Sequence, residues 1–206
     1  MKKWEGVIRI KNNFFRKVKT LYIYIIAQIR YKMRFGKLGW RAHIIKPLLL
    51  LNPRNIYCSD CVRIYKNSRI ETIEKWNDQH FQPSIYIGEK TSFEQNLHMT
   101  CANSIIIGKE NVFSANVLVT DINHEYRNIH TNVMLQDISV QSVKIGDYCF
   151  IGMGAKIMPG SVIGNNCIIG ANTMVMGEIP DYSVAVGMPA RVIKKYSFET
   201  EKWEKV

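Results

Sequence analysis

The sequence contains no apolar run long enough to cross a membrane and no secretory leader. The most apolar stretch, residues 21–29, is flanked by Lys19 and Arg30, whereas a membrane-spanning helix needs about 20 apolar residues. The N-terminus also lacks the apolar segment and the small-residue cleavage site of a signal peptide. We therefore expect a cytoplasmic protein.

Cysteine is scarce and odd in number. Five cysteines cannot all pair, which argues against a disulfide framework in a cytoplasmic chain. Cys58 and Cys61 form a Cys-x-x-Cys pair, but no second pair of Cys or His lies at ligand spacing, so no metal is expected. Because a buried free Cys behaves as a small apolar residue, we interpret the cysteines as packing residues.

Acidic residues are nearly absent from the first quarter of the chain. Residues 1–46 contain 13 Lys or Arg and one acid, Glu5, whereas the rest contains 15 basic and 16 acidic residues. An excess of positive charge spread along the whole chain would suggest nucleic acid as a partner. Here the excess is confined to one segment that also carries Trp4, Leu21 and Ile25. We expect a basic amphipathic helix that contacts the inner membrane surface peripherally, or else a packing helix with a solvated basic face.

The second half of the chain has a period of six. Aliphatic residues occupy every sixth position: Ile145, Ile151, Ile157, Ile163, Ile169 and Val175. Glycine follows four of them, at Gly146, Gly152, Gly164 and Gly170. Small residues come four positions after the first five, at Cys149, Ala155, Ser161, Cys167 and Thr173. A helix places apolar residues three and four apart and a strand places them two apart, so neither alone explains this pattern.

A period of six fits a short strand followed by a tight turn, repeated three times per triangular coil. The aliphatic residues then point inward and stack on their equivalents in the next coil. Glycine, Asn165, Asn166 and Asn172 would supply the unusual backbone angles of the corners. The sequence therefore predicts an all-β protein built as a parallel β-helix with triangular coils.

The same frame occurs earlier with two interruptions. Ile87-Gly88 and Ile107-Gly108 repeat it, and residues 56–64 fit a degenerate early coil. The phase is lost near residues 65–84 and 120–142, and loops that leave a repetitive scaffold commonly carry function. The predicted organisation is a basic N-terminal helical segment at 1–46, the repeat domain at 47–195 and a charged C-terminal tail at 196–206.

Residues 145–164 resemble the hexapeptide-repeat acyltransferase superfamily, and the resemblance extends over roughly residues 54–195. Members fold as left-handed parallel β-helices, an exception to the right-handed crossover rule. They assemble as homotrimers and hold acetyl-CoA between neighbouring subunits. The resemblance implies this fold, a trimer and acetyl-CoA as co-substrate, with no metal.

Residues 120–126 resemble the Asp-x-Asn-His segment of capsular and lipopolysaccharide O-acetyltransferases, relatives of the maltose and galactoside acetyltransferases. The resemblance implies that His124 is the general base. An imidazole with an ordinary pKa near ~6.5 can accept the proton of a sugar hydroxyl at neutral pH. It also implies that the backbone N–H of Met153 stabilises the oxyanion.

The partners of His124 stay open at this level. Asp121 and Glu125 are the nearest carboxylates that could fix its tautomer, and the sequence does not choose between them. By resemblance, Asn96 on the preceding coil lies near the acceptor, with His98 as a second candidate.

The coenzyme contacts implied by the resemblance fall in the C-terminal coils: Gly152, Met153, Ala171, Met176, Gly177, Arg191 and Lys194. Arg191 and Lys194 would face the phosphates of CoA. The chain departs from its relatives at Met176-Gly177, where they often carry Thr-Lys, so one expected phosphate-binding lysine is missing.

The function predicted is transfer of acetyl from acetyl-CoA to a sugar hydroxyl of a bacterial surface polysaccharide or its precursor. The main alternative keeps the fold but acetylates an amino sugar. A γ-type carbonic anhydrase would need three zinc-binding histidines, and the spacing of His98, His124 and His130 does not resemble that scheme. A non-enzymatic scaffold is the fourth hypothesis.

Overall fold

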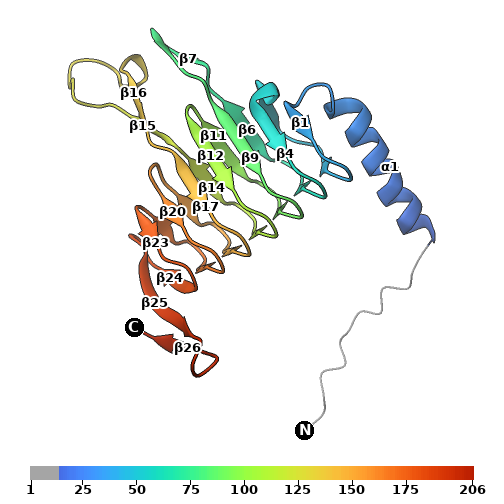
Figure 1. The fold of residues 1–206 in the computed structure, drawn as a ribbon. Coiled ribbons are helices and arrows are strands. Elements are labelled where there is room, and N and C mark those ends of the chain that lie inside the picture. The colour runs from blue at the N-terminus through green and yellow to red at the C-terminus, as the bar shows by residue number, and fades with distance from the viewer. Residues whose placement is uncertain (1–13) are drawn as a thin grey trace.

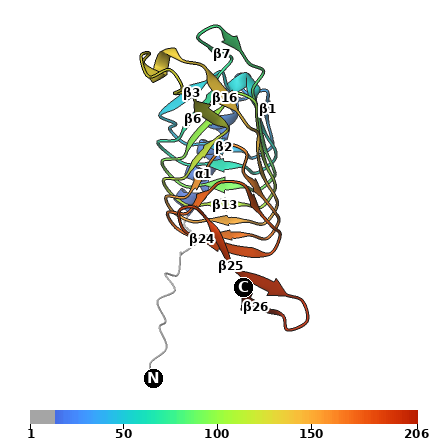
Figure 2. The ribbon, with the colours of Figure 1, turned by 90° about the vertical axis from the view of Figure 1, so that its left-hand side faces the viewer.

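The computed structural model describes residues 14–206; residues 1–13, with Trp4 and Glu5 of the predicted basic segment, lie outside the described residues. The described chain winds through stacked coils, and each coil except the last contributes one short strand to each of three parallel sheets (Figures 1 and 2). We call these sheets faces A, B and C in chain order, and the edges between them AB, BC and CA.

The strands of the three faces follow one another in a fixed rotation. Face A contains β1 (Lys37–Leu38), β4 (Ile56–Cys58), β9 (Ser84–Ile87), β12 (Ser104–Ile107), β17 (Val143–Ile145), β20 (Val162–Ile163) and β23 (Glu178–Ile179). Face B contains β2 (His43–Ile44), β5 (Arg63–Ile64), β10 (Ser92–Phe93), β13 (Val112–Phe113), β18 (Phe150–Ile151), β21 (Ile168–Ile169) and β24 (Ser183–Val186). Face C contains β3 (Leu49–Leu51), β6 (Arg69–Thr72), β11 (His98–Cys101), β14 (Leu118–Thr120), β19 (Lys156–Ile157) and β22 (Met174–Val175). The predicted all-β, left-handed parallel β-helix is confirmed.

The six aliphatic residues of the periodic pattern form the core. All of them are buried, and the register pairs Ile145 with Ile163 and Ile157 with Val175. On face B, Phe93 and Phe113 extend the interior column of Ile151 and Ile169, and the two rings are stacked at 4.5 Å between centroids. Like side chains therefore stack on like, because each coil repeats the pattern of its neighbour.

The corners explain the glycine and asparagine positions. Asn166 and Asn172 have φ of 54° and 55°, as the sequence predicts. Asn165 has another role, since its side-chain Oδ1 accepts a hydrogen bond from the Asp147 N–H at 2.9 Å. Gly88 is required by close approach, because a Cβ there would lie 2.4 Å from the backbone carbon of Gly108 in the next coil.

The cysteine interpretation is confirmed for four residues and wrong for Cys61. The buried cysteines are Cys58, Cys101, Cys149 and Cys167. Cys61 is only partly buried and occupies a corner of edge AB with φ of 59°, so it turns the chain instead of filling the core. Burial raises the pKa of the Cys58 thiol to about 12, which opposes the thiolate form that metals bind.

Additional elements decorate the β-helix at both ends and on one side. Helix α1 (Phe14–Tyr31) packs on the first coil, where Gln28 Nε2 donates to the carbonyls of Gly39 and Ala42 at 3.1 Å. The coils begin at Lys37, ten residues before the boundary expected at residue 47, because β1 and β2 already pair in register with β4 and β5. Among the described residues, no helix has the length and apolarity needed to cross a membrane.

The C-terminal residues form a hairpin. β25 (Arg191–Ser197) pairs antiparallel with β24 and with β26 (Lys202–Lys205). The charged tail expected at 196–206 therefore contains the end of β25 and the whole of β26, which extend face B (Figure 1). Two short 3-10 turns, η1 (Pro53–Asn55) and η2 (Val133–Leu135), also leave the strands of the stack.

Candidate active site

Two hairpins leave the β-helix from the same edge, CA. The first, β7 (Lys75–Trp76) with β8 (Gln79–His80), follows β6. The second, β15 (Ile122–His124) with β16 (Ile138–Val140), follows β14 two coils later. Both project from the same side of the molecule (Figure 1). The two predicted interruptions therefore become neighbours in space.

Hydrogen bonds join the two hairpins. Trp76 Nε1 and Asn77 Nδ2 both donate to the carbonyl of Gln136, at 2.9 and 3.0 Å. Gln79 makes a reciprocal pair with Ile138: its Nε2 donates to the Ile138 carbonyl at 3.1 Å and its Oε1 accepts from the Ile138 N–H at 2.8 Å. The hairpins are thus one docked unit, because amides and an indole satisfy backbone groups of the longer loop.

His124 lies at the end of β15 and is exposed. Its ring meets the indole of Trp76 edge to face, with 5.0 Å between ring centroids and 65° between ring planes. The backbone of His124 is opposite Ile138 in the β15–β16 ladder. The imidazole is therefore presented to solvent from a strand and supported on one side by an aromatic ring, which suits a group that must exchange protons with a bound ligand.

Asp121 is fully buried beneath the hairpin. Its carboxylate accepts hydrogen bonds from the backbone N–H groups of Ala102 and Asn103, both at 2.8 Å, and from the Cys101 thiol at 3.3 Å. Burial and the charge of Asp121 raise the pKa of Cys101. The structure shows no hydrogen bond between Asp121 and His124, so the Asp121 carboxylate anchors the base of the loop to the preceding coil.

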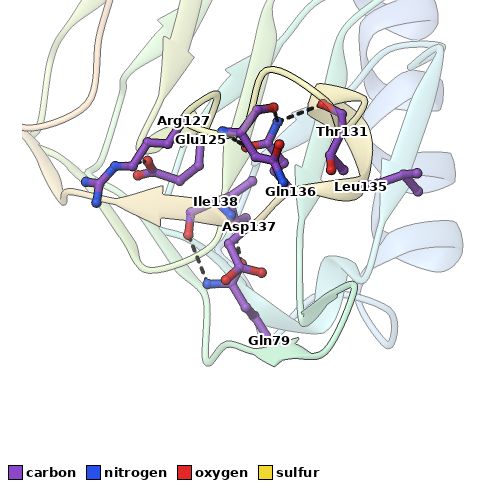
Figure 3. Close-up of a pocket in the computed structure, with 9 residues that line it drawn as sticks. Gln79, Glu125, Arg127, Thr131, Leu135, Gln136, Asp137 and Ile138 are labelled. Atoms are coloured by element: carbon purple, nitrogen blue, oxygen red, sulfur yellow. Dashed lines mark hydrogen bonds and ion pairs between the residues drawn. The ribbon is translucent and has the colours of Figure 1, made fainter.

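Glu125 lies beside a hollow in the second hairpin. Its carboxylate pairs with Arg127 at 3.1 Å, and its backbone N–H donates to the Asp137 carbonyl at 2.9 Å. The hollow has a volume of about 600 Å³, and Figure 3 shows its lining from both hairpins. Its walls are formed by Gln79, Glu125, Arg127, Asn128, Thr131, Leu135, Gln136, Asp137 and Ile138. A carboxylate pair, amides and a guanidinium make it a polar hollow suited to hydroxylated ligands.

Asn96 and Met153 lie on another edge, BC, at the other end of face C. Asn96 occupies a corner with φ of 63°, and its Nδ2 donates to Asn116 Oδ1 at 2.8 Å. Met153 is exposed, its carbonyl accepts from the Asn172 N–H, and its own N–H has no hydrogen-bond partner within residues 14–206. A free backbone donor on an exposed corner fits the role of oxyanion donor.

The residues implied in coenzyme binding divide between the two edges. Gly152 and Ala171 lie on edge BC beside Met153, whereas Met176 and Gly177 lie on edge CA. Arg191 and Lys194 lie on β25. A face C strand of three or four residues, about 10–13 Å long, separates the two edges. One chain alone therefore does not bring His124 to Met153. Within the described part of the chain, no cluster of His, Cys, Asp or Glu has the composition of a metal site.

Comparison with known proteins identifies the repeat. Residues 142–177 match the family described as bacterial transferase hexapeptide (six repeats). This segment of the chain carries hexapeptide repeats. This hexapeptide-repeat protein is 32% identical over 129 residues to the putative lipopolysaccharide biosynthesis O-acetyl transferase WbbJ of Escherichia coli K12, a match that covers 59% of the chain and 65% of the relative. The chain thus matches slightly less than two thirds of that relative's length.

Solved structures share the fold of this hexapeptide-repeat protein. A mutant of AntD, an N-acyltransferase from Bacillus cereus solved with dTDP and coenzyme A, superposes with a TM-score of 0.65 at 19% identity, covering 82% of this chain and 88% of AntD. A galactoside acetyltransferase in complex with coenzyme A gives a TM-score of 0.53 at 21% identity, covering 93% and 86%. The predicted resemblance to hexapeptide-repeat acyltransferases is confirmed by the repeat match and by these similarities.

The sequence alone did not predict the roles of Trp76, Gln79 and Gln136 at this site. Trp76 falls in the first phase break and contacts His124 from the second, 48 positions along the chain. The available signal was the co-occurrence of two phase breaks after strands of the same face, since segments that leave one edge of a repeat scaffold lie near one another.

Proposed function

We propose that this hexapeptide-repeat protein transfers acetyl from acetyl-CoA to a sugar hydroxyl of a bacterial surface polysaccharide or its precursor. The observation that carries the proposal is the placement of His124, an exposed imidazole held against Trp76 on a loop ejected from the repeat scaffold. The similarity to a lipopolysaccharide O-acetyl transferase supports the acceptor class. The polar hollow beside Glu125 supports a hydroxylated acceptor.

The reaction is a direct transfer. His124 takes the proton of the acceptor hydroxyl as the oxygen attacks the thioester carbon, and the carbonyl oxygen becomes an oxyanion that accepts from the Met153 N–H. The oxyanion collapses, the carbon–sulfur bond breaks and the imidazolium returns its proton to the CoA sulfur. Arg191 and Lys194 pair with the phosphates of CoA. Asn96 lies beside the acceptor. Of the two carboxylates Asp121 and Glu125, Glu125 is the better candidate to orient His124, because the buried Asp121 carboxylate is bonded to the preceding coil.

The proposed site is shared between subunits of a homotrimer. Reacting atoms must approach to about 3–3.5 Å, yet His124 projects from edge CA while Met153 lies on edge BC of the same chain. A neighbour whose edge BC lies against this edge CA would complete the site. The proposed location is cytoplasmic, with peripheral contact to the inner membrane through residues 1–46. Sedimentation that gives a monomer under turnover conditions would contradict the shared site.

His124→Ala tests the base. Release of free CoA thiol from acetyl-CoA with a panel of sugar acceptors should fall about 10²–10⁴-fold, the usual contribution of general base catalysis. Because the ring is exposed and its aromatic partner lies outside the core, the melting temperature should stay unchanged. His130→Ala is the matched control, since His130 is an exposed histidine of the same loop. Near-full turnover by His124→Ala would refute the assignment.

The alternative acceptor is an amine, as in the N-acyltransferase that shares the fold. Paired acceptors that differ only in bearing a hydroxyl or an amino group at one carbon separate the two. Acetylation of the amino member alone would replace the hydroxyl proposal.

A further inference from the structure

Helix α1 is apolar on two faces. Its inner face packs on the first coil through Ala27 and Tyr31, both buried. A helix that packs on one side only should be polar on the other. The outer face instead carries exposed large apolar side chains at helical spacing: Val18, Leu21, Tyr22, Ile25, Ile29 and, just past the helix end, Met33. Ile29 is 74% exposed and Met33 97% exposed.

This outer stripe lies at one end of the molecule. Figure 1 shows α1 alongside β1 at the N-terminal end of the stack, away from the C-terminal hairpin. Trp40 is also 73% exposed. It follows Gly39, whose carbonyl accepts a hydrogen bond from Gln28 of α1. Tryptophan is enriched at membrane interfaces, because its ring is apolar and its N–H is polar.

A basic hollow borders the stripe. It lies between α1 and the first coil and has a volume of about 380 Å³. Its lining includes Arg30, Arg34, Lys46, Leu48 and Leu49. No carboxylate lines it, and Arg30, Arg34 and Lys46 form no ion pair with any described residue. Three cations therefore converge beside exposed leucines.

We propose that the outer face of α1 docks on an anionic phospholipid bilayer, with its apolar stripe among the acyl chains and headgroup phosphates held by Arg30, Arg34 and Lys46. The inference rests on the membrane contact included in the proposed function and names the surface that makes it. A bilayer matches both observations, since it offers apolar chains beneath a layer of negative charge. A second copy of the chain fits poorly, because residues 1–46 carry 13 basic residues and one acid, so like charges would meet.

Flotation of the full chain with vesicles tests the surface. The chain should float with vesicles of phosphatidylethanolamine and phosphatidylglycerol and stay in solution with pure phosphatidylcholine. Without acetyl-CoA or acceptor in the assay, the result is independent of whether acetyl transfer occurs. High salt should weaken the binding because it screens the headgroup charge.

Two double variants separate the apolar and the charged contributions. Ile29→Gln with Met33→Gln should lower the partition coefficient at least about tenfold, because the two side chains lose acyl-chain contact. Arg30→Gln with Arg34→Gln should lower it about 30-fold at low salt, since each basic residue near an anionic surface contributes about fivefold. Lys202→Gln with Lys205→Gln removes the same charge from the opposite end and should leave binding unchanged, as should Ile129→Gln, another exposed isoleucine.

Three results would overturn the inference. The first is that the wild-type chain binds neither kind of vesicle. The second is that the Lys202 and Lys205 variant loses as much binding as the Arg30 and Arg34 variant. The third is that the Ile29 and Met33 variant changes the oligomeric state in sedimentation. The last result would assign the stripe to contacts between copies of the chain.

Discussion

Removal of the Trp76 side chain should lower turnover while leaving the β-helix folded. Trp76→Ala deletes the indole hydrogen bond to the Gln136 carbonyl at 2.9 Å and the edge-to-face contact with His124 at 5.0 Å. A hydrogen bond contributes about 0.5–1.5 kcal/mol net, and an aromatic pair contributes about 0.5–1.5 kcal/mol. The interactions that hold the imidazole in place therefore lose about 1–3 kcal/mol of stabilisation, which corresponds to a fall in kcat of about 5- to 150-fold.

The assay measures kcat and KM for acetyl-CoA in matched variants. Trp76→Phe keeps an aromatic edge but loses the indole N–H, so kcat should fall only about 2- to 12-fold. KM for acetyl-CoA and the melting temperature should not change, because Trp76 is neither one of the implied coenzyme residues nor a member of the buried core. Asn77→Gly is the control, since it removes an exposed bond to the same carbonyl, keeps its backbone at φ of 49° and leaves the indole in place.

Equal turnover by Trp76→Ala and the wild-type chain would refute the argument that the first hairpin positions His124. A parallel loss of turnover and melting temperature would show instead that the hairpin is part of the folding core.

Two further predictions concern stability. Asp121→Asn should lower the free energy of unfolding by about 3 kcal/mol and the melting temperature by roughly 6–12 °C. The reason is that an amide nitrogen would face backbone N–H groups that now donate to the carboxylate. Lost turnover with an unchanged melting temperature would point instead to a direct action on His124. Burial, with a smaller contribution from the charge of Arg63, lowers the pKa of His43, which packs between Tyr24 and Tyr65. The folded state then binds fewer protons than the unfolded state, so stability is fully present above about pH 6.5 and falls as the pH drops below it. His43→Phe should reduce the loss of unfolding free energy between about pH 7.5 and about pH 5.5, and an unchanged loss would refute this.

The repeat could be predicted because its information is local. Each hexad carries its own core residue, small residue and turn residue, and the coils stack equivalent positions, so Ile145 and Ile163 pair as the period requires. The start of the stack was harder to place, because β1 and β2 are only two residues long. Both lie in the basic segment, where frequent Lys and Arg obscure the six-residue period. Because the period is local, its interruptions could also be found in the sequence, and one of them is the loop that carries His124.

The sequence by itself thus determined the β-helix, its core and the loop that carries His124. Tertiary structure alone decided how that loop is held, because the bonds from Trp76 and Gln79 to Gln136 and Ile138 join positions 59 and 60 residues apart. It also decided that Asp121 anchors the preceding coil and that the stripe on α1 points away from the core. These outcomes depend on which edges and faces meet in space, and a period read along the chain carries no information about contacts between segments that leave it.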